Sequence, residues 1–411
     1  MKVLIITAGR YPVPAVKGGA VSNLVEHLIE SNSIDKEVDL YVTSPYDSKA
    51  KEKAENYKNC TFKFIRIPKI LKNMENVLYN IFKVIFPKKN LISIKSICSF
   101  SWFILKNAVV LKKNEFDCVI VENTARLFWC FKLFGNRKKY NGKVYYHLHN
   151  EPKKLGGCES VIKECKKIIC VSEFIKNVLI SGKNKLYINN ENKVKVLYNC
   201  IDTYKFQCSS EKDILDFKKK LDIKNDDRVI LFSGRIDNEK GVIEVLEALN
   251  YIKTKNIKLL IVGSSFYGMN VKTPFEEKII NIVEKNKEKV IFTGFLNYSE
   301  MPLAYSTCEI AVLPSMWDEP AGLTIVEAMS CGKAVITTKS GGIPEYANSN
   351  CAVLLERNEN ISKNIAERVD FLLSNNEIKE EIGIKARKRV VENFDSNLYI
   401  KKMINIIKDN R

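Results

Sequence analysis

The chain has 411 residues, of which 45% are hydrophobic, and its formal net charge at pH 7 is +18. This length exceeds what one hydrophobic core usually serves, so we expect two domains of about 200 residues each. No uncharged apolar run reaches the ~18 to 20 residues that a bilayer-spanning helix needs, which excludes an integral membrane protein of that kind.

Twelve cysteines are scattered through the chain, and several lie in apolar runs, among them Cys118, Cys170 and Cys351. This distribution predicts buried, reduced thiols. There is no CxxC pair and no Cys/His cluster with zinc spacing, so we expect no structural metal site. The apolar start of the chain is too short for a signal peptide and predicts a first buried strand. A cytoplasmic protein is therefore expected.

Short apolar runs alternate with longer amphipathic segments along the whole chain. The first series covers residues 3–6, 38–42, 118–121, 144–148, 168–171 and 194–197, and the second starts at Val229, Leu259, Val290, Ile310, Ala334 and Cys351. Strands that alternate with helical stretches predict parallel sheets covered on both faces. The sequence thus predicts an α/β protein of two such domains, joined near residues 199–210. No short-period repeat is present, which disfavours solenoids and propellers.

Two glycines, Gly18 and Gly19, lie between the first predicted strand and a predicted helix over residues 20–30. A loop in this position often lets the backbone approach a ligand closely. A plain turn explains the pair equally well. Because the GxGxxG fingerprint is missing, a nicotinamide-binding role is disfavoured.

The chain has only three histidines. His149 ends the strand-like run 144–149 and so lies at the carboxyl end of a predicted strand. His147 shares its face but lies deeper, where a core histidine is expected, and for His149 a core role and a functional role both stay open. We expect His27 to lie on a helix, at its surface or packed against it.

In the second half, Gly234 to Gly241 follow the apolar strand 229–232 and precede a helical pattern over residues 242–249. Ligands of open parallel sheets collect at the carboxyl ends of strands, so Arg235 and Lys240 are candidates to face a ligand crevice. Most such cations are ordinary surface residues. Their place in a glycine-bounded loop after a buried strand favours the functional interpretation.

The stretch W-D-E-P-A-G-L-T-I-V-E-A over residues 317–328 follows another buried strand, which ends at Pro314. It places Glu319 on a loop and Glu327 in a helix that begins near Thr324. The amides of Gly322, Leu323 and Thr324 are helix N-terminal donors that suit a diphosphate. Two glutamates at this spacing also occur by chance, as solvated helix charges.

These residues together predict a site for a nucleotide sugar. The diphosphate of the leaving group gains negative charge, and Arg235, Lys240 and the helix amides could stabilise it as fixed positive charge. No convincing Asp-x-Asp metal pair is present, so we predict metal-independent chemistry without a cofactor. Glu327 is expected to accept hydrogen bonds from the ribose.

At these motifs the sequence resembles the family 4 glycosyltransferases, also called group 1 glycosyl transferases, which are retaining enzymes of the GT-B fold. The matching residues are Gly234-Arg235 with Glu239-Lys240-Gly241, the stretch from Glu319 to Glu327, Asn199-Cys200-Ile201-Asp202 and Gly341-Gly342-Ile343-Pro344-Glu345. The resemblance covers essentially the whole chain and is more specific in the C-terminal half.

The resemblance implies two Rossmann-like, doubly wound domains with an interdomain cleft. Residues 1–203 would form the acceptor-binding domain, residues 204–395 the nucleotide-sugar-binding domain, and residues 396–411 a helix that crosses back to the first domain. It also implies that Gly18 and Gly19 border the donor diphosphate and the acceptor, that His149 faces the reacting sugar, and that Glu319 contacts the donor hexose.

The function implied is retaining transfer of a hexosyl unit from a nucleotide sugar, with UDP-sugars the first choice, to a saccharide or lipid-linked saccharide. Many family members build capsule, exopolysaccharide or lipopolysaccharide, and some similar proteins are associated with spore coats. Two alternatives stay open. A sugar-nucleotide epimerase would change the donor without an acceptor, and a non-catalytic coat or scaffold protein would bind the donor weakly or not at all.

Two features depart from the family pattern. Cys200 stands where the family commonly has glycine, and a positive φ there would strain it. Phe266-Tyr267-Gly268 is inserted after Gly263-Ser264-Ser265, where a glycine-rich form is commoner.

Residues 66–113 carry ten of the basic residues against one acid, Glu75, and also contain bulky apolar side chains. This mixture is typical of segments that bind an anionic membrane face peripherally. A core helix pair whose lysines point to water explains it equally well. Nucleic acid is rejected as the main partner, because no recognised nucleic-acid-binding motif accompanies the charge.

Overall fold

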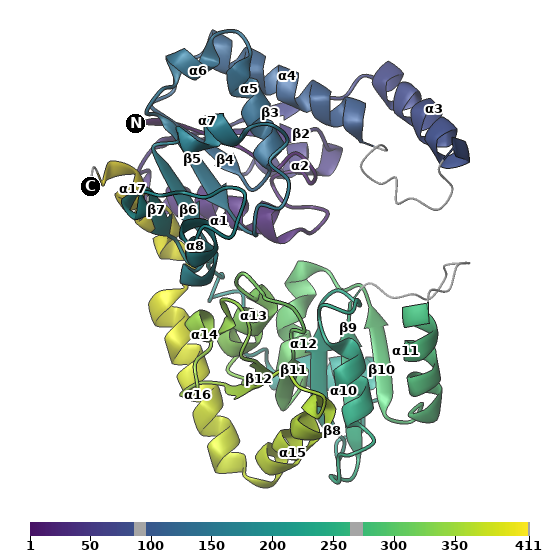
Figure 1. The fold of residues 1–411 in the computed structure, drawn as a ribbon. Coiled ribbons are helices and arrows are strands. Elements are labelled where there is room, and N and C mark those ends of the chain that lie inside the picture. The colour runs from purple at the N-terminus through teal and green to yellow at the C-terminus, as the bar shows by residue number, and fades with distance from the viewer. Residues whose placement is uncertain (86–95, 264–273, 410–411) are drawn as a thin grey trace. The chain divides into compact units, whose positions relative to one another are not determined.

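The computed structural model describes residues 1–85, 96–263 and 274–409 (Figure 1). The chain divides into two compact units, Met1–Leu197 with Asn397–Arg411, and Tyr198–Ser396. The sequence places the join at residues 203 and 204 and the final segment from residue 396, a few residues from these boundaries. Within the described residues, no helix is both long enough and apolar enough to cross a membrane.

The first unit is built on a seven-stranded parallel sheet. Its central strands are apolar almost throughout, as expected where both faces of a sheet are covered. Its strands are β1 (Lys2–Ile6), β2 (Asp39–Pro45), β3 (Cys60–Ile65), β4 (Cys118–Glu122), β5 (Val144–Leu148), β6 (Lys167–Cys170) and β7 (Val194–Val196). They lie in the order β3-β2-β1-β4-β5-β6-β7.

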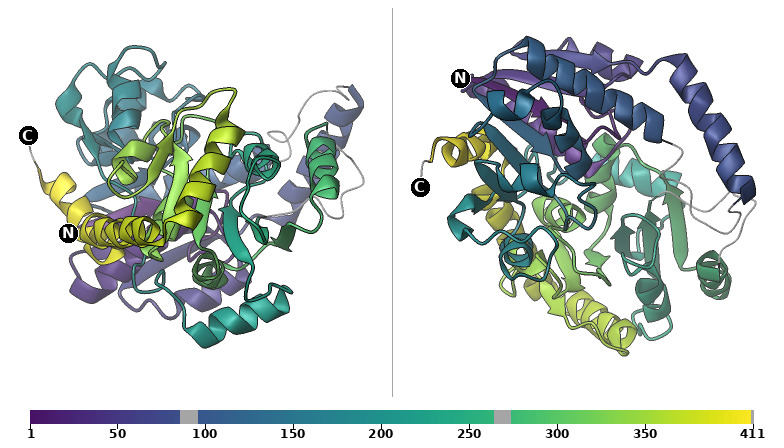
Figure 2. Two further views of the ribbon diagram at one scale, coloured as in Figure 1. Left: turned by 90° about the horizontal axis from the view of Figure 1, so that it is seen from below. Right: turned by 45° about the horizontal axis from the view of Figure 1, so that its top comes forward.

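Helices cover both faces of this sheet (Figure 2). The helices of this unit are α1 (Ala20–Asp35), α2 (Ser48–Ala54), α3 (Lys69–Ile85), α4 (Ile97–Lys113), α5 (Trp129–Lys132), α6 (Asn136–Lys139), α7 (Glu159–Lys163), α8 (Glu173–Ile180) and α17 (Tyr399–Lys408), with 3-10 turns η1 (Ala125–Phe128) and η2 (Glu191–Lys193). Of these, α3 packs against α4 and extends beyond the sheet (Figure 1). The C-terminal helix α17 belongs to this unit. Ser31 Oγ donates to the carbonyl of Asn397 at 2.8 Å, and the Tyr145 hydroxyl donates to that of Ile407 at 3.1 Å.

The second unit has a six-stranded parallel sheet in the order β10-β9-β8-β11-β12-β13. Its strands are β8 (Arg228–Ser233), β9 (Ile257–Val262), β10 (Val290–Gly294), β11 (Ile310–Leu313), β12 (Ala334–Thr338) and β13 (Val353–Leu355). Its helices are α9 (Glu211–Lys220), α10 (Val242–Ala248), α11 (Pro274–Lys285), α12 (Met301–Thr307), α13 (Leu323–Ser330), α14 (Ile343–Tyr346), α15 (Ile361–Ser374) and α16 (Asn376–Asn393).

Both sheets have the strand order of a doubly wound Rossmann-like fold. The chain leaves the sheet centre in one direction and returns to continue in the other, so the order reverses between β1 and β4 and again between β8 and β11. Loops that follow these strands at their carboxyl ends leave a crevice in which such folds bind ligands. The candidate residues named from the sequence lie in or beside these loops.

The predicted fold class, two parallel α/β units, is confirmed by the two sheets. The edge strand β3 was not predicted, although C-T-F-K-F-I alternates in the way a half-buried strand does. Five non-glycine residues of the described chain have positive φ, and Cys200 is not among them, so the strain considered for it does not arise. The insertion Phe266-Tyr267-Gly268 lies outside the described residues.

Candidate functional site

In the second unit, the loops after β8 and β11 pack directly against each other. Gly241 has a φ of +73°, and a Cβ there would lie 2.0 Å from the carbonyl oxygen of Pro314. Only glycine fits so close an approach of two backbones. The Met316 amide also donates to the Glu239 carbonyl at 2.8 Å. The two loops that the sequence analysis assigns to one site therefore lie in direct contact, and the site itself stays a prediction.

Glu319 is the centre of this arrangement. Its Oε2 accepts from Lys240 Nζ at 2.6 Å, Trp317 Nε1 at 2.8 Å and Ser315 Oγ at 3.2 Å. Gly341, with a φ of +54°, passes so near that a Cβ there would lie 2.3 Å from the Glu319 carbonyl oxygen. Three donors thus hold one oxygen of the carboxylate, and the close approach of Gly341 confines the backbone of Glu319.

The other predicted cation lies differently. Arg235 is 63% exposed in its side chain and pairs with two acids of its own loop, Asp237 at 2.7 Å and Glu239 at 3.0 Å. Of the two cations, the structure therefore brings Lys240, and not Arg235, into contact with Glu319.

Helix α13 begins beside this cluster. Gly322, with a φ of +85°, is its N-cap, and no side chain caps its first turn. The amides of Leu323 and Thr324 are therefore available to an anion, and the helix dipole favours negative charge at this end.

Glu327 lies one turn into α13, buried in a polar network. Its Oε2 accepts from the Tyr305 hydroxyl at 2.9 Å, and that hydroxyl also lies 2.8 Å from Ser233 Oγ. Burial raises the pKa of Glu327 to about 7, although the hydrogen bonds from Tyr305 and Tyr298 oppose the rise. Glu327 can therefore change its protonation state near neutral pH.

In the first unit, Gly18 and Gly19 lie between β1 and α1 with φ values of +72° and +103°, and Gly19 is the N-cap of α1. A Cβ at Gly19 would lie 3.0 Å from the ring of Tyr11, whereas one at Gly18 would meet nothing within 4 Å. The loop thus needs glycine for its backbone conformation. Its predicted ligand role stays a prediction.

His147 of β5 and His149, which directly follows this strand, both contact Glu122 of β4. His149 Nε2 lies 2.7 Å from Glu122 Oε2, and His147 Nδ1 lies 3.2 Å from Glu122 Oε1. All three side chains are buried, His147 more deeply than His149, as predicted. His27 is also buried and contacts Glu30 through Nδ1 at 3.1 Å.

The protonation of this group follows from its surroundings. Burial alone would raise the pKa of Glu122, but the two imidazoles outweigh it and lower the pKa to about 2. Burial and the neighbouring His147 lower the pKa of His149 to about 4. At neutral pH, the Nε2–H group of a neutral His149 therefore donates a hydrogen bond to the ionised Glu122. The Nδ1 atom of His149 has no hydrogen-bond partner among the described residues.

Glu122, His147 and His149 are also the described residues whose ligand atoms lie close enough together, within 4.8 Å, to hold a metal ion. Two imidazoles and a carboxylate are ligands that zinc accepts. The sequence expectation of no metal was based on cysteine and histidine spacing and did not consider this group.

Sequence reasoning missed Glu122, Tyr305 and a role for Trp317. An acid that ends a fully buried strand is a signal that could have identified Glu122. The contacts of Tyr305 and Trp317 depend on tertiary packing and left no comparable signal.

Two Rossmann-like units, each with its polar residues at the point where strand order reverses, make this an α/β protein of the GT-B class. Residues 213–389 match the family model described as glycosyl transferases group 1. This part of the chain is therefore similar to that family, and its curated relatives include glycosyltransferases.

Individual comparisons agree. The chain is 26% identical to spore coat protein SA of Bacillus subtilis over 313 residues, 73% of this chain and 80% of that protein. It is 28% identical to lipopolysaccharide 1,2-N-acetylglucosaminetransferase of Salmonella typhimurium over 240 residues, 57% of each. The crystal structure of Anabaena Alr3699/HepE in complex with UDP aligns with a TM-score of 0.71, at 18% identity, over 98% of this chain and 99% of that one.

Proposed function

We propose that this protein is a retaining glycosyltransferase that moves a hexosyl unit from a nucleotide sugar to a saccharide or lipid-linked saccharide. The donor that we favour is a UDP-sugar. The observation that carries the proposal is the contact between Lys240 and Glu319 beside the uncapped start of α13. A cation, a fixed carboxylate and helix amides on adjoining loops suit the diphosphate and the sugar of one donor molecule.

Each residue has a role in this proposal. Lys240 and the amides of Leu323 and Thr324 stabilise the departing diphosphate. Arg235 also binds the diphosphate once its ion pairs with Asp237 and Glu239 are broken. Glu319 positions the hexose, and Glu327 accepts hydrogen bonds from the ribose. His149 faces the reacting sugar as a neutral imidazole whose Nδ1 is an acceptor, because Glu122 holds its Nε2 proton.

The transfer proceeds without a metal in this proposal. Fixed cations and amides supply the positive charge that a divalent ion supplies in other transferases. The Glu122, His147 and His149 group then acts through its internal hydrogen bonds. Activity that survives EDTA supports this, and loss that only added zinc reverses would show that the group is a metal site.

A role in cell-surface polysaccharide synthesis is supported by the relatives, which include a lipopolysaccharide sugar transferase and a capsular polysaccharide glycosyltransferase. The UDP and UDP-glucose complexes of the structural neighbour support a UDP-sugar donor. None of the twelve cysteines, all of which lie in the described part of the chain, forms a disulfide, which suits the reducing cytoplasm.

Helix α3 carries the proposed contact with an anionic membrane face. Its inner side is anchored through Glu75, which accepts from the amide and the hydroxyl of Ser99. Its outer side exposes apolar residues at helical spacing together with exposed lysines. These are Ile70, Met74, Val77, Ile81 and Val84, with Lys69, Lys72 and Lys83. Such a face suits the interface of a bilayer with acidic lipids.

Flotation with phosphatidylglycerol vesicles at low and high salt tests this contact. The unaltered protein should float, and Val77→Glu with Ile81→Glu should abolish flotation, whereas glutamates at exposed Ile384 and Val391 of α16 should not. Equal flotation of both double variants would show that α3 is not the contact.

The transfer itself is tested by thermal shift and hydrolysis against UDP-, GDP- and ADP-sugars. We expect one donor to stabilise the protein and to be hydrolysed slowly in EDTA. No response to any donor would remove the proposal and favour a coat or scaffold role.

A further inference from the structure

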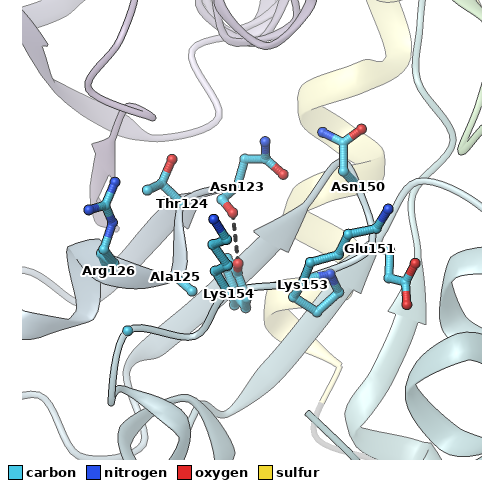
Figure 3. A pocket seen from close by; sticks show the side chains of 11 residues that line it. Asn123, Thr124, Ala125, Arg126, Asn150, Glu151, Lys153 and Lys154 are labelled. Carbon is cyan, nitrogen blue, oxygen red and sulfur yellow. Dashed lines mark hydrogen bonds between the residues drawn. The ribbon is translucent and has the colours of Figure 1, made fainter. Parts of the chain in front are cut away.

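A separate pocket of about 470 Å³ lies in the first unit, where β4 and β5 end. Its wall comes from the turn after β4 and the loop after β5, and Figure 3 shows the side chains that extend from them. Its charged and amide-bearing members are Asn123, Arg126, Asn150, Glu151, Lys153 and Lys154, and Thr124 and Tyr146 add hydroxyl groups. We call it the β4–β5 pocket.

The pocket is positively charged. Arg126, Lys153 and Lys154 line it against a single carboxylate, Glu151, whose Oε1 accepts a hydrogen bond from Asn184 at 2.9 Å. Among the described residues, none of the three cations has a salt bridge, in contrast to Lys240 and Arg235 of the other unit. Three unpaired cations that line one concave surface attract an anion more strongly than scattered surface charges do.

Arg126 is held in place by packing. Gly156, with a φ of +58°, lies so near that a Cβ there would be 2.4 Å from Arg126 Cγ. On another side, the guanidinium carbon lies 5.0 Å from the centroid of the Phe100 ring. The Phe100 ring thus favours one position of the exposed guanidinium, whose planar donors suit an oxyanion.

Asn123 joins the pocket to the histidine group. Its side-chain Oδ1 accepts from the His149 amide at 3.1 Å, and its carbonyl accepts from the Tyr146 hydroxyl at 2.7 Å. Its φ of +53° is unusual for a residue other than glycine, and these bonds hold it there. A ligand in the β4–β5 pocket therefore lies next to the residue proposed to face the reacting sugar.

From this geometry we infer that the β4–β5 pocket binds an oxyanion, phosphate or carboxylate, carried by the acceptor saccharide. The inference rests on the proposed function, because it names the class of acceptor. An oxyanion forms charge-assisted hydrogen bonds with these exposed cations in place of water, whereas a neutral sugar offers them no opposite charge.

Calorimetric titration of the full chain tests this with three sugars that share one ring: glucose 1-phosphate, methyl glucuronide and methyl glucoside. We expect one or both anionic sugars to bind at least about tenfold more tightly than the neutral one. Which anion binds distinguishes a phosphate-bearing from a uronic acid acceptor. The double variant Lys153→Gln with Lys154→Gln should lose this preference, and Lys153→Arg with Lys154→Arg should keep it.

Two controls locate the binding. Lys49→Gln with Lys51→Gln removes two exposed lysines of the same unit that do not line the pocket and should change nothing. Lys240→Ala should also keep the preference. Preference lost only in Lys240→Ala would place the anion at the donor site and overturn the inference, as would equal affinity for all three sugars. Donor hydrolysis by the unaltered protein tests the proposed function separately, since it needs no acceptor.

Discussion

Replacing Lys240 by alanine removes the cation that contacts Glu319. Lys240 Nζ lies 2.6 Å from Glu319 Oε2, and the two side chains are 22% and 12% exposed. In the variant, Glu319 keeps the hydrogen bonds from Trp317 and Ser315. The carboxylate of Glu319 therefore loses one of its three hydrogen-bond donors and keeps two.

Two free energies follow from this geometry. A hydrogen bond to a charged group contributes about 1.5–3 kcal/mol to stability. Because the pair is partly exposed and Glu319 keeps two other donors, the free energy of unfolding should fall by about 1–2 kcal/mol. Loss of a group that stabilises developing negative charge typically slows turnover by about 10² to 10³, or about 2.7–4 kcal/mol. The catalytic loss should thus exceed the loss of stability.

Both quantities are measurable on the same protein preparations, turnover by donor hydrolysis and stability by urea unfolding. Lys385→Ala, which removes an exposed lysine paired with Glu381, is the matched control. Glu319→Gln and the double variant complete a cycle. Near-normal turnover of Lys240→Ala, with a stability loss equal to that of Glu319→Gln, would show that Lys240 only supports Glu319 and would refute the catalytic argument.

Three further predictions concern backbone fit and pH. Gly341→Ala should lower the free energy of unfolding, measured in urea, by more than about 2 kcal/mol, because the new Cβ meets the Glu319 backbone. The control Gly182→Ala has a positive φ but open space around it and should lower that free energy by about 1 kcal/mol. Equal losses in the two variants would contradict the close approach at Gly341. The pKa of Glu327 is about 7 in the folded state and 4.5 in the unfolded state, so between these pH values the folded state holds an extra proton and the free energy of unfolding should fall as pH rises. Glu327→Gln should remove this pH dependence, and an unchanged dependence would contradict the burial argument. The pKa of His149 is about 4 in the folded state and 6.5 in the unfolded state, so the free energy of unfolding should fall as the pH drops from 6.5 to 4. His149→Gln should flatten this part of the plot of unfolding free energy against pH.

The sequence predicted the sheet architecture well because parallel strands buried on both faces leave continuous apolar runs. The runs that start near Val3, Cys118 and Val229 all became strands. The strand β3 was missed because it lies at a sheet edge and only alternates in polarity. Edge strands bury one face and therefore give a weaker signal.

Contacts between candidate site residues could be predicted from the sequence only where the residues belong to motifs that follow adjacent strands. Lys240 and Glu319 follow adjacent strands, β8 and β11, and their contact is what that order implies. The pairing of Arg235 with its own loop acids, and the link from Glu122 to His149, depend on side-chain conformations that spacing does not encode. The β4–β5 pocket escaped notice for the same reason, since its cations come from two separate loops.

The most direct test of the central claim is a proton NMR time course of UDP-α-glucose, and of the other donors found to stabilise the protein, with purified protein and EDTA. The account predicts slow release of the sugar with the α anomer appearing first, which reports cleavage, retention and metal independence together. The β anomer first would contradict retention, an intact nucleotide sugar of changed configuration would indicate an epimerase, and an unchanged spectrum for every donor would contradict the assignment as an active glycosyltransferase.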